Sequence, residues 1–268
     1  MLELESAHFL ELYRSFPSPI AALDCGKKCS PYNEGGAPFC CDTRHAIPSA
    51  YPGEWVYLQA NTDLWHPWQS PDLAEYQRVL SEAAPGQVLI ECQGHRLCQR
   101  QFRSMACREF PFFPYLTRQG DFIGLAYYWE YADRCWVISN LSQVTKQYRQ
   151  QFIETYDALF ALSSQEKERF RYHCGIVRRT FGRQHRSITL LHRDGEMYEV
   201  TPRNSSLRRV EIEQLPRFGP YAVAVRLPFP DEDGKRIDNG LADVGQTVSL
   251  PRIEAQGVGQ ADSLPYNK

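Results

Sequence analysis

Long hydrophobic runs are missing from this sequence. It has no apolar stretch of about 18 residues, the length that a membrane-spanning helix needs. The first residues are acidic and amphipathic, and they lack the basic segment followed by an apolar one that a secretory signal peptide has. We therefore expect a cytoplasmic protein without a membrane partner. In that compartment thiols stay reduced and disulfides are rare.

An excess of charge of one sign is also missing. The chain has 30 Lys and Arg against 32 Asp and Glu, a formal net charge of −2, which argues against a general nucleic-acid binder. Residues 167–186 are basic with Phe and Tyr interleaved, a pattern compatible with nucleic-acid binding. Such segments are more often solvated helix faces, so we do not expect a nucleic-acid partner. The sequence also has no Gly-rich phosphate loop, nucleophile elbow or distinct pair of carboxylates, and it indicates no catalytic residue.

What the sequence does have is cysteine. A chain of 268 residues buries a large enough core without crosslinks, so its nine cysteines do not imply a disulfide framework. Clustered thiolates select zinc or iron–sulfur centres over harder ions. We expect eight of them to be metal ligands, with disulfides and unrelated buried thiols as the alternatives: Cys25, Cys29, Cys40, Cys41, Cys92, Cys98, Cys107 and Cys135. Cys174, which stands apart at an expected helix end, is interpreted as a structural thiol.

The spacing of these cysteines fits none of the common short motifs. A zinc ribbon needs two C-x2-C knuckles, and neither these nor a bacterial ferredoxin run is present. Radical enzymes that use S-adenosylmethionine show C-x3-C-x2-C, but here Tyr32 takes the third position. Successive side chains of an extended backbone point to opposite faces, so Cys40 and Cys41 favour two metal ions or a bent site with several metals. The sequence does not decide which four cysteines share a centre.

The segment around Cys107 carries a resemblance. Residues 103–112, RSMACREFPF, are similar to the motif R-P-x-x-C-R-x-F/Y-P-F of the YkgJ-type cysteine-cluster family, whose CxxCxxCC domain is described as zinc- or iron-chelating. The resemblance covers about residues 20–140. Ser104 replaces the family's Pro, and ten residues separate Cys29 from Cys40 where the family has fewer. The resemblance implies a cysteine-ligated zinc or iron centre. A lysine methylase of flagellin is a distant relative of that family.

Other side chains could contribute to the same site. His95, three residues before Cys98, is better placed to complete a mixed site than His45, His66 or His173. Arg103 and Arg108 flank Cys107. Both could compensate the negative charge of a thiolate site, or both could form surface ion pairs, and the sequence leaves this open.

The hydrophobic pattern predicts an α+β fold. We expect helices over 2–16, from Ser70 to residue 84, over 141–162, and from a capping box at Ser163 to near Gly175. Strands are expected at 88–90, 122–129 and 221–227. Asp194-Gly195 predicts a two-residue hairpin in which Leu191 faces Tyr198 and Arg193 faces Glu196. The predicted organisation is a helix-and-loop, cysteine-rich metal-binding domain (1–175), a small antiparallel β-rich region (176–252) and a flexible tail (253–268).

These expectations describe a metal-binding protein. Its centre would hold zinc or iron, the iron alone or in an iron–sulfur cluster, and would have a structural or redox role. The alternative is an enzyme that uses the centre, such as a protein-modifying enzyme of the methylase type, which would keep one coordination position open. Beyond the metal ion itself, the sequence identifies no protein partner or substrate.

Overall fold

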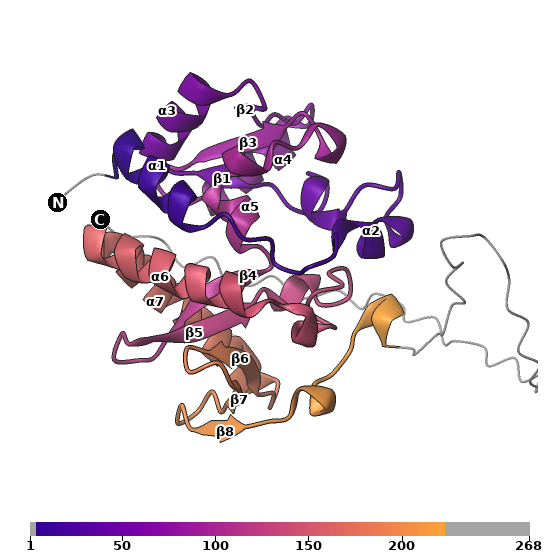
Figure 1. Cartoon of the computed structure of the whole chain (residues 1–268), viewed down its shortest axis with the longest axis vertical. Helices are drawn as coiled ribbons and strands as arrows, with labels where there is room; N and C mark the ends of the chain where they lie inside the picture. The colour runs from indigo at the N-terminus through magenta and orange to yellow at the C-terminus, as the bar shows by residue number, and fades with distance from the viewer. Residues whose placement is uncertain (1–3, 223–268) are drawn as a thin grey trace, which may run out of the picture. The chain divides into compact units, whose positions relative to one another are not determined.

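The computed structural model describes residues 4–222, which lie in one compact unit, Met1–Ala224. It contains helices and two antiparallel sheets, which confirms the α+β class (Figure 1). The smaller sheet has the order β1-β3-β2, with β1 at Ser49–Ala50, β2 at Trp65–Pro67 and β3 at Val88–Cys92. In its register Trp65 lies opposite Cys92, so the first cysteine after the strand predicted at 88–90 is still part of the sheet.

The larger sheet has five strands in the order β4-β5-β6-β7-β8. Their bounds are Phe112–Leu116, Phe122–Tyr127, Ile188–His192, Met197–Val200 and Leu207–Arg209. All five side chains of β4 are buried, which explains the aromatic-proline run after Cys107. Because β6 pairs with β5, the strands after residue 176 are not a separate region. The predicted tail and most of the predicted strand 221–227 lie outside the described residues.

Two long helices pack against this sheet. Helix α6 (Lys146–Leu162) contacts β5, and α7 (Ser164–Arg183) contacts β4 (Figure 1). The Ser163 side chain accepts a hydrogen bond from the Glu166 N–H, which confirms the predicted cap. The predicted end near Gly175 is wrong, and so is the boundary at 175, because α7 continues to Arg183. A glycine inside a helix costs only about 1 kcal/mol, and apolar side chains buried at helical spacing on both sides stabilise it.

Two N-terminal helices differ from prediction mainly at their ends: α1 covers Ser6–Ser15 and α4 covers Leu73–Glu82. A third, α3 (Pro52–Asn61), was not predicted from the sequence. The cap of α4 is Asp72, whose carboxylate accepts from the N–H groups of Ala74 and Glu75. Ser70, the predicted cap, donates instead to the Glu75 carboxylate.

The β6–β7 hairpin differs from its predicted register by one residue. Tyr198 lies opposite Leu190, and Met197 lies opposite Leu191. The loop has three residues, since the N–H of His192 donates to the carbonyl of Glu196, and Gly195 has φ of 95°. A three-residue loop with glycine in the left-handed region is the next most common hairpin connection after the two-residue turn.

The remaining elements are short. They are α2 (Gly26–Cys29), α5 (Met105–Glu109) and eight 3-10 turns at Ser30–Tyr32, Phe39–Cys41, His95–Leu97, Arg100–Phe102, Trp129–Tyr131, Leu141–Gln143, Ile212–Gln214 and Gly219–Tyr221. Over residues 4–222, no helix is both long and apolar enough to cross a membrane.

Candidate functional site

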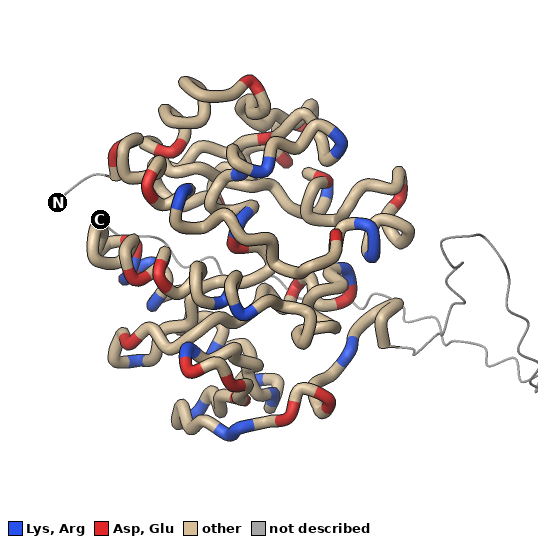
Figure 2. Tube along the Cα trace, in the orientation of Figure 1, with Lys and Arg blue, Asp and Glu red and all other residues tan. Residues whose placement is uncertain are grey.

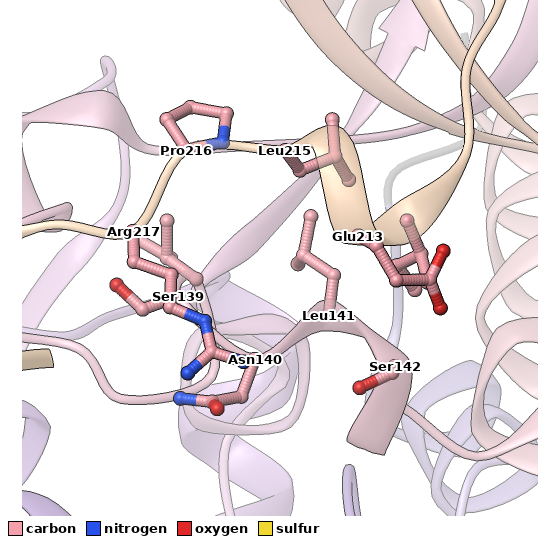
Figure 3. Close-up of a pocket in the computed structure, with 10 residues that line it drawn as sticks. Ser139, Asn140, Leu141, Ser142, Glu213, Leu215, Pro216 and Arg217 are labelled. Carbon is pink, nitrogen blue, oxygen red and sulfur yellow. The ribbon is translucent and has the colours of Figure 1, made fainter. Parts of the chain in front are cut away.

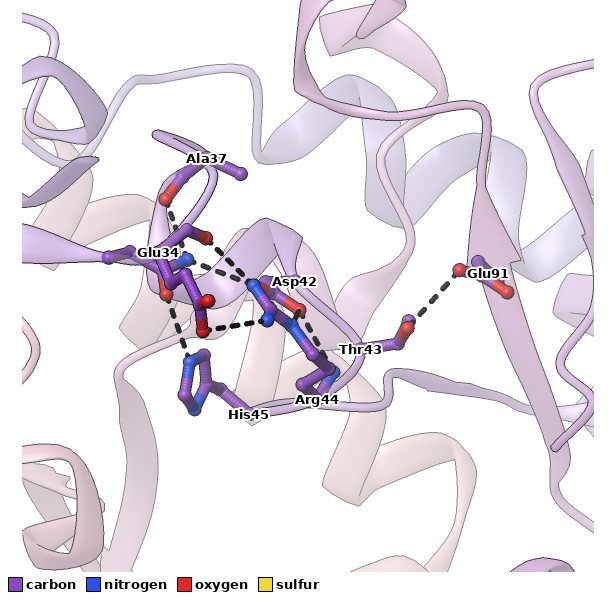
Figure 4. Close-up of polar contacts among 8 residues, drawn as sticks. Glu34, Ala37, Asp42, Thr43, Arg44, His45 and Glu91 are labelled. Carbon is purple, nitrogen blue, oxygen red and sulfur yellow. Dashed lines mark hydrogen bonds and ion pairs between the residues drawn. The ribbon is translucent and has the colours of Figure 1, made fainter. Parts of the chain in front are cut away.

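The segment that carries the first four cysteines is held by a polar network (Figure 4). Asn33 donates to the Ala37 carbonyl and to Asp42, and its side-chain oxygen bonds His45 at 3.1 Å. Arg44 donates to Asp42 and to the Glu34 carbonyl. The hydrogen bonds from Arg44 hold the pKa of Asp42 well below its usual value. The segment therefore has structural support besides its thiols, which the sequence did not indicate.

Two contacts join this segment to the parts of the chain that carry the later cysteines. The hydroxyl of Thr43 donates to Glu91 in β3, as Figure 4 shows, at 3.2 Å. The hydroxyl of Tyr131 donates to the carbonyl of His45 at 2.8 Å. The first contact brings the segment to the strand that ends at Cys92, and the second brings it to the turn before Cys135.

A buried carboxylate positions Cys107. Glu54 of α3 accepts hydrogen bonds from the Tyr13 hydroxyl (2.6 Å), the Met105 N–H (2.6 Å) and the Tyr51 N–H (3.1 Å). Burial raises the pKa of Glu54 even though these bonds favour its charged form. At the same helix start, the Ser104 hydroxyl accepts from the Cys107 N–H at 3.3 Å. Ser104 is thus the cap of α5.

The two arginines that flank Cys107 have different roles. Arg108 is 9% exposed and donates to the backbone carbonyls of Phe16, Arg103 and Gln101, so it holds three segments together. Arg103 instead donates from Nε to the sulfur of Cys98 at 3.3 Å. Burial acts to lower the pKa of Arg103, but the bond to Cys98 and the neighbouring thiols raise it. Charge compensation is therefore supported for Arg103, while Arg108 is structural.

All eight predicted cysteines line one cavity, whose volume is about 1390 Å³. They come from four separate parts of the chain: the 24–48 segment, the end of β3, the turns before α5 together with α5 itself, and the turn after β5. Cys174 is not among them. Its sulfur is buried beneath β4, where it accepts from the Leu116 N–H at 3.2 Å. The predicted separation of Cys174 from the other eight agrees with this placement.

Electrostatic effects between the thiols indicate two groups. Burial is the main cause that raises the pKa of Cys25 to about 11 and that of Cys135 to about 12, and the thiols that contribute most are Cys29 and Cys25 respectively. Burial likewise raises the pKa of Cys107 to about 12. Apart from the contact between Cys40 and Cys41 and the effect of Cys41 on Cys29, the thiol charges that raise neighbouring pKa values link Cys25, Cys29, Cys40 and Cys135 in a first group and Cys41, Cys92, Cys98 and Cys107 in a second.

The adjacent pair lies where these groups meet. Cys40 and Cys41 belong to a 3-10 turn, and their sulfurs are 4.0 Å apart. Because the backbone here is bent, the argument from an extended backbone does not apply, and the turn is compatible with the bent site that the sequence also allowed. The hydrogen bond between the two thiol groups raises the pKa of Cys40 and lowers that of Cys41. Cys29 also responds to the charge of Cys41, so the groups are neighbours.

The eight thiols around the cavity are the type of ligand that a soft metal prefers. Their sulfur atoms, however, are not close enough together to bind one ion. Among residues 4–222, no three His, Cys, Asp or Glu side chains are placed as a bound ion would require. The histidines add little to the donor set. His45 bonds Asn33, His66 bonds the Pro67 carbonyl, and His95 lines the cavity in a 3-10 turn. The case for a metal site thus rests on the eight thiols that line the cavity and on the positive charge of Arg103 beside Cys98.

A second, small cavity of about 50 Å³ lies between residues 138–142 and 212–217 (Figure 3). No cysteine or histidine lines it. The Ser139 hydroxyl, one of several polar groups in its wall, accepts from the Phe218 N–H at 2.9 Å. Glu213 is the one carboxylate in its wall, so this cavity does not bring together a set of metal-ligating side chains.

No family model, curated protein or solved structure matches this chain. Its function must therefore be inferred from its own residues.

Proposed function

We propose that this protein binds zinc or iron, the iron alone or in an iron–sulfur cluster, through the eight cysteines that line the large cavity. The observation that carries the proposal is that eight of the nine cysteines, from four separate parts of the chain, line the same cavity. Thiols that serve only as small buried hydrophobes, as Cys174 does, have no reason to collect around one space. Thiolate ligation needs reduced cysteines, so the proposal places the protein in a reducing compartment such as the cytoplasm.

The charges near the cavity support thiolate ligation. Burial raises the pKa of Cys25, Cys107 and Cys135, so a metal must displace their protons when it binds. Four thiolates around a divalent ion leave excess negative charge, and a hydrogen bond to a ligating sulfur reduces it. Arg103 makes such a bond to Cys98. The bound metal would crosslink the four parts of the chain, and its binding energy would contribute to folding.

The two groups of thiols suggest two metal centres per protein. Cys25, Cys29, Cys40 and Cys135 would form one four-thiolate centre, and Cys41, Cys92, Cys98 and Cys107 would form the other. The resemblance to the YkgJ-type family implies a centre of this kind and remains an expectation. A closed four-thiolate site favours a structural or electron-transfer role over a catalytic one.

The test is elemental analysis and visible absorption of protein purified without oxygen. Zinc gives a colourless protein, and an iron–sulfur cluster gives a brown one. Cys107→Ser should lose metal, and Cys174→Ser is the matched control because it changes a buried thiol away from the cavity. Protein that contains no metal, and takes up none when zinc or iron and sulfide are supplied, would overturn the proposal.

A second candidate function is an enzyme that uses one centre in catalysis, such as a protein-modifying enzyme. One observation favours it: the same cavity is lined by Glu109 and His173, polar side chains that the metal sites do not need. A centre with only three cysteine ligands would distinguish this function from the first, because a catalytic metal keeps a position open.

A further inference from the structure

Arg178 of α7 is a buried cation without a carboxylate partner. It is 8% exposed, and its Nη1 atom donates to the Leu116 carbonyl at 2.7 Å and to the Tyr115 hydroxyl at 3.4 Å. Its Cζ atom also lies 5.7 Å from the centre of the Tyr115 ring. None of these partners carries a full negative charge, and within residues 4–222 no carboxylate pairs with Arg178. Proteins seldom bury an arginine without an anionic partner.

The Nη2 atom of Arg178 is the part of this side chain that a ligand can reach. It has no hydrogen-bond partner in the described part of the chain, and it is not fully enclosed by protein. It lies beside Gly175, one turn earlier in α7, because a Cβ atom added to that glycine would be 3.9 Å from it. The glycine therefore leaves a notch in the surface of the helix next to the guanidinium group.

Arg179 brings a second guanidinium group to this notch. Its Nη1 atom would be 3.4 Å from the same added Cβ atom. Arg179 is exposed, and it forms no hydrogen bond or ion pair with any residue in the range 4–222. One nitrogen of each guanidinium group thus lies within 4 Å of a single point, where the two like charges repel each other and one oxyanion can bridge them. Arg169 and Arg171 of the same helix differ, because Glu166 and Glu168 already pair with them.

The same face of α7 carries exposed apolar side chains. Tyr172, three residues before Gly175, is 60% exposed, and Ile176, three residues before Arg179, is 41% exposed. Residues three or four positions apart are neighbours on the surface of a helix, so both side chains lie beside the notch. Ligand sites combine apolar surface with a few placed polar groups. This combination suits a ligand that is anionic at one end and apolar at the other.

We propose that this face of α7 binds a small phosphate monoester. Its phosphate group bridges Arg178 Nη2 and Arg179 Nη1, and its organic group covers Tyr172 and Ile176. A phosphate monoester carries close to two negative charges near pH 7, which balances two guanidinium groups better than the single charge of a carboxylate does. None of these four residues lines the large cavity, so the proposal goes beyond the metal sites.

Calorimetric titration of the full-length protein, purified without oxygen, with phenyl phosphate tests the proposal. The salt concentration should be about 0.15 M, so that unspecific attraction between charges is screened. Two matched probes are inorganic phosphate, which lacks the ring, and benzoate, which carries less negative charge. We expect phenyl phosphate to bind at least about tenfold more tightly than benzoate, and also more tightly than inorganic phosphate. The proposal is overturned if phenyl phosphate does not bind, or if either probe binds as tightly.

Substitutions locate the site on α7. Arg179→Gln should weaken the binding of phenyl phosphate by at least about tenfold. Gly175→Ala should lose most of the binding, because the added methyl group fills the notch, and it should keep the fold, because alanine is the better helix former. Arg171→Gln is the matched control: its charge is already paired with Glu168, so affinity should change by less than about twofold. Wild-type affinity in both Arg179→Gln and Gly175→Ala, or an equal loss in Arg171→Gln, would overturn the assignment.

Discussion

The thiol-lined cavity and the core beneath the five-stranded sheet are built in different ways. The core has β4, α6 and α7 in contact, with Phe112, Phe152 and Tyr156 at most 1% exposed. The segments that bring cysteines to the cavity are turns, the short helices α2 and α5 and the end of β3, and most of their side chains are only half-buried. Burial of aromatic side chains stabilises the first region without help. The second relies on a few polar contacts and, in our proposal, on metal.

Metal removal should therefore destabilise the cavity segments while the core stays folded, and we expect it to have the largest effect on stability among these predictions. Chelation, or Cys107→Ser, should lower the free energy of unfolding by several kcal/mol, because the binding energy of a metal at a thiolate site contributes to folding. Hydrogen exchange should rise steeply in residues 24–48 and 92–107 while β4 and β5 stay protected. Equal protection of residues 24–48 with and without metal would mean that the polar network around Asp42 suffices.

The two arginines that flank Cys107 allow stability without metal to be tested separately from metal binding. Arg108→Gln should destabilise the protein by about 3 kcal/mol even without metal, because it leaves buried backbone carbonyls unpaired. Arg103→Gln should cost less than about 1 kcal/mol in the metal-free protein but should weaken metal binding, since Arg103 bonds Cys98. Denaturant unfolding and competition with a chelator measure the two quantities. Identical behaviour of the two variants would contradict their separate roles.

The pH dependence of stability tests the packing of α7 at the cavity wall through His173. Its pKa in the folded protein, about 4, lies below the ordinary value of 6.5, so the unfolded chain binds the proton more tightly. The neutral imidazole therefore stabilises the folded protein above pH 6.5, and this stabilisation of about 3 kcal/mol is lost as the pH falls toward 4. His173→Gln should remove that part of the slope in denaturant unfolding at successive pH values. An unchanged slope would show that His173 does not titrate this way.

The sequence predicted the strongly patterned elements and the set of cavity-lining cysteines. Strands such as β5 and helices such as α6 follow from local hydrophobic patterns. The one-residue error at Asp194-Gly195 arose because the same turn residues suit two- and three-residue loops. Glu109 and Glu54 were missed because only the fold brings them to the cavity wall and to the start of α5. The positions of His173 and Arg178 depend on the packing of α7 against β4, which no local pattern specifies.

The charged residues along α7 agree with their interpretation from the sequence. The basic segment 167–186 is partly neutralised within the helix, since Arg169 pairs with Glu166 and Arg171 with Glu168. Figure 2 shows acidic and basic residues interspersed over the described part of the chain. Ion pairs at a spacing of three residues are typical of a solvated helix face, as the sequence interpretation favoured.

Cys174→Ser should have the smallest effect. Its hydroxyl can replace the sulfur as acceptor from the Leu116 N–H and as donor to the Pro114 carbonyl, so stability should change by about 1 kcal/mol or less. The metal content measured by native mass spectrometry should equal that of the wild type. Loss of one equivalent of metal would place Cys174 in the site after all.

The adjacent pair Cys40-Cys41 tests the central claim most directly, because its sulfurs, 4.0 Å apart, lie where the two thiol groups meet. Metal would be counted by native mass spectrometry in Cys40→Ser, in Cys41→Ser and in the double variant, all purified without oxygen. Two four-thiolate centres predict that each single change reduces the metal content and that the double change reduces it further. Full metal content in either single variant, or a double variant no worse than one single variant, would contradict two centres.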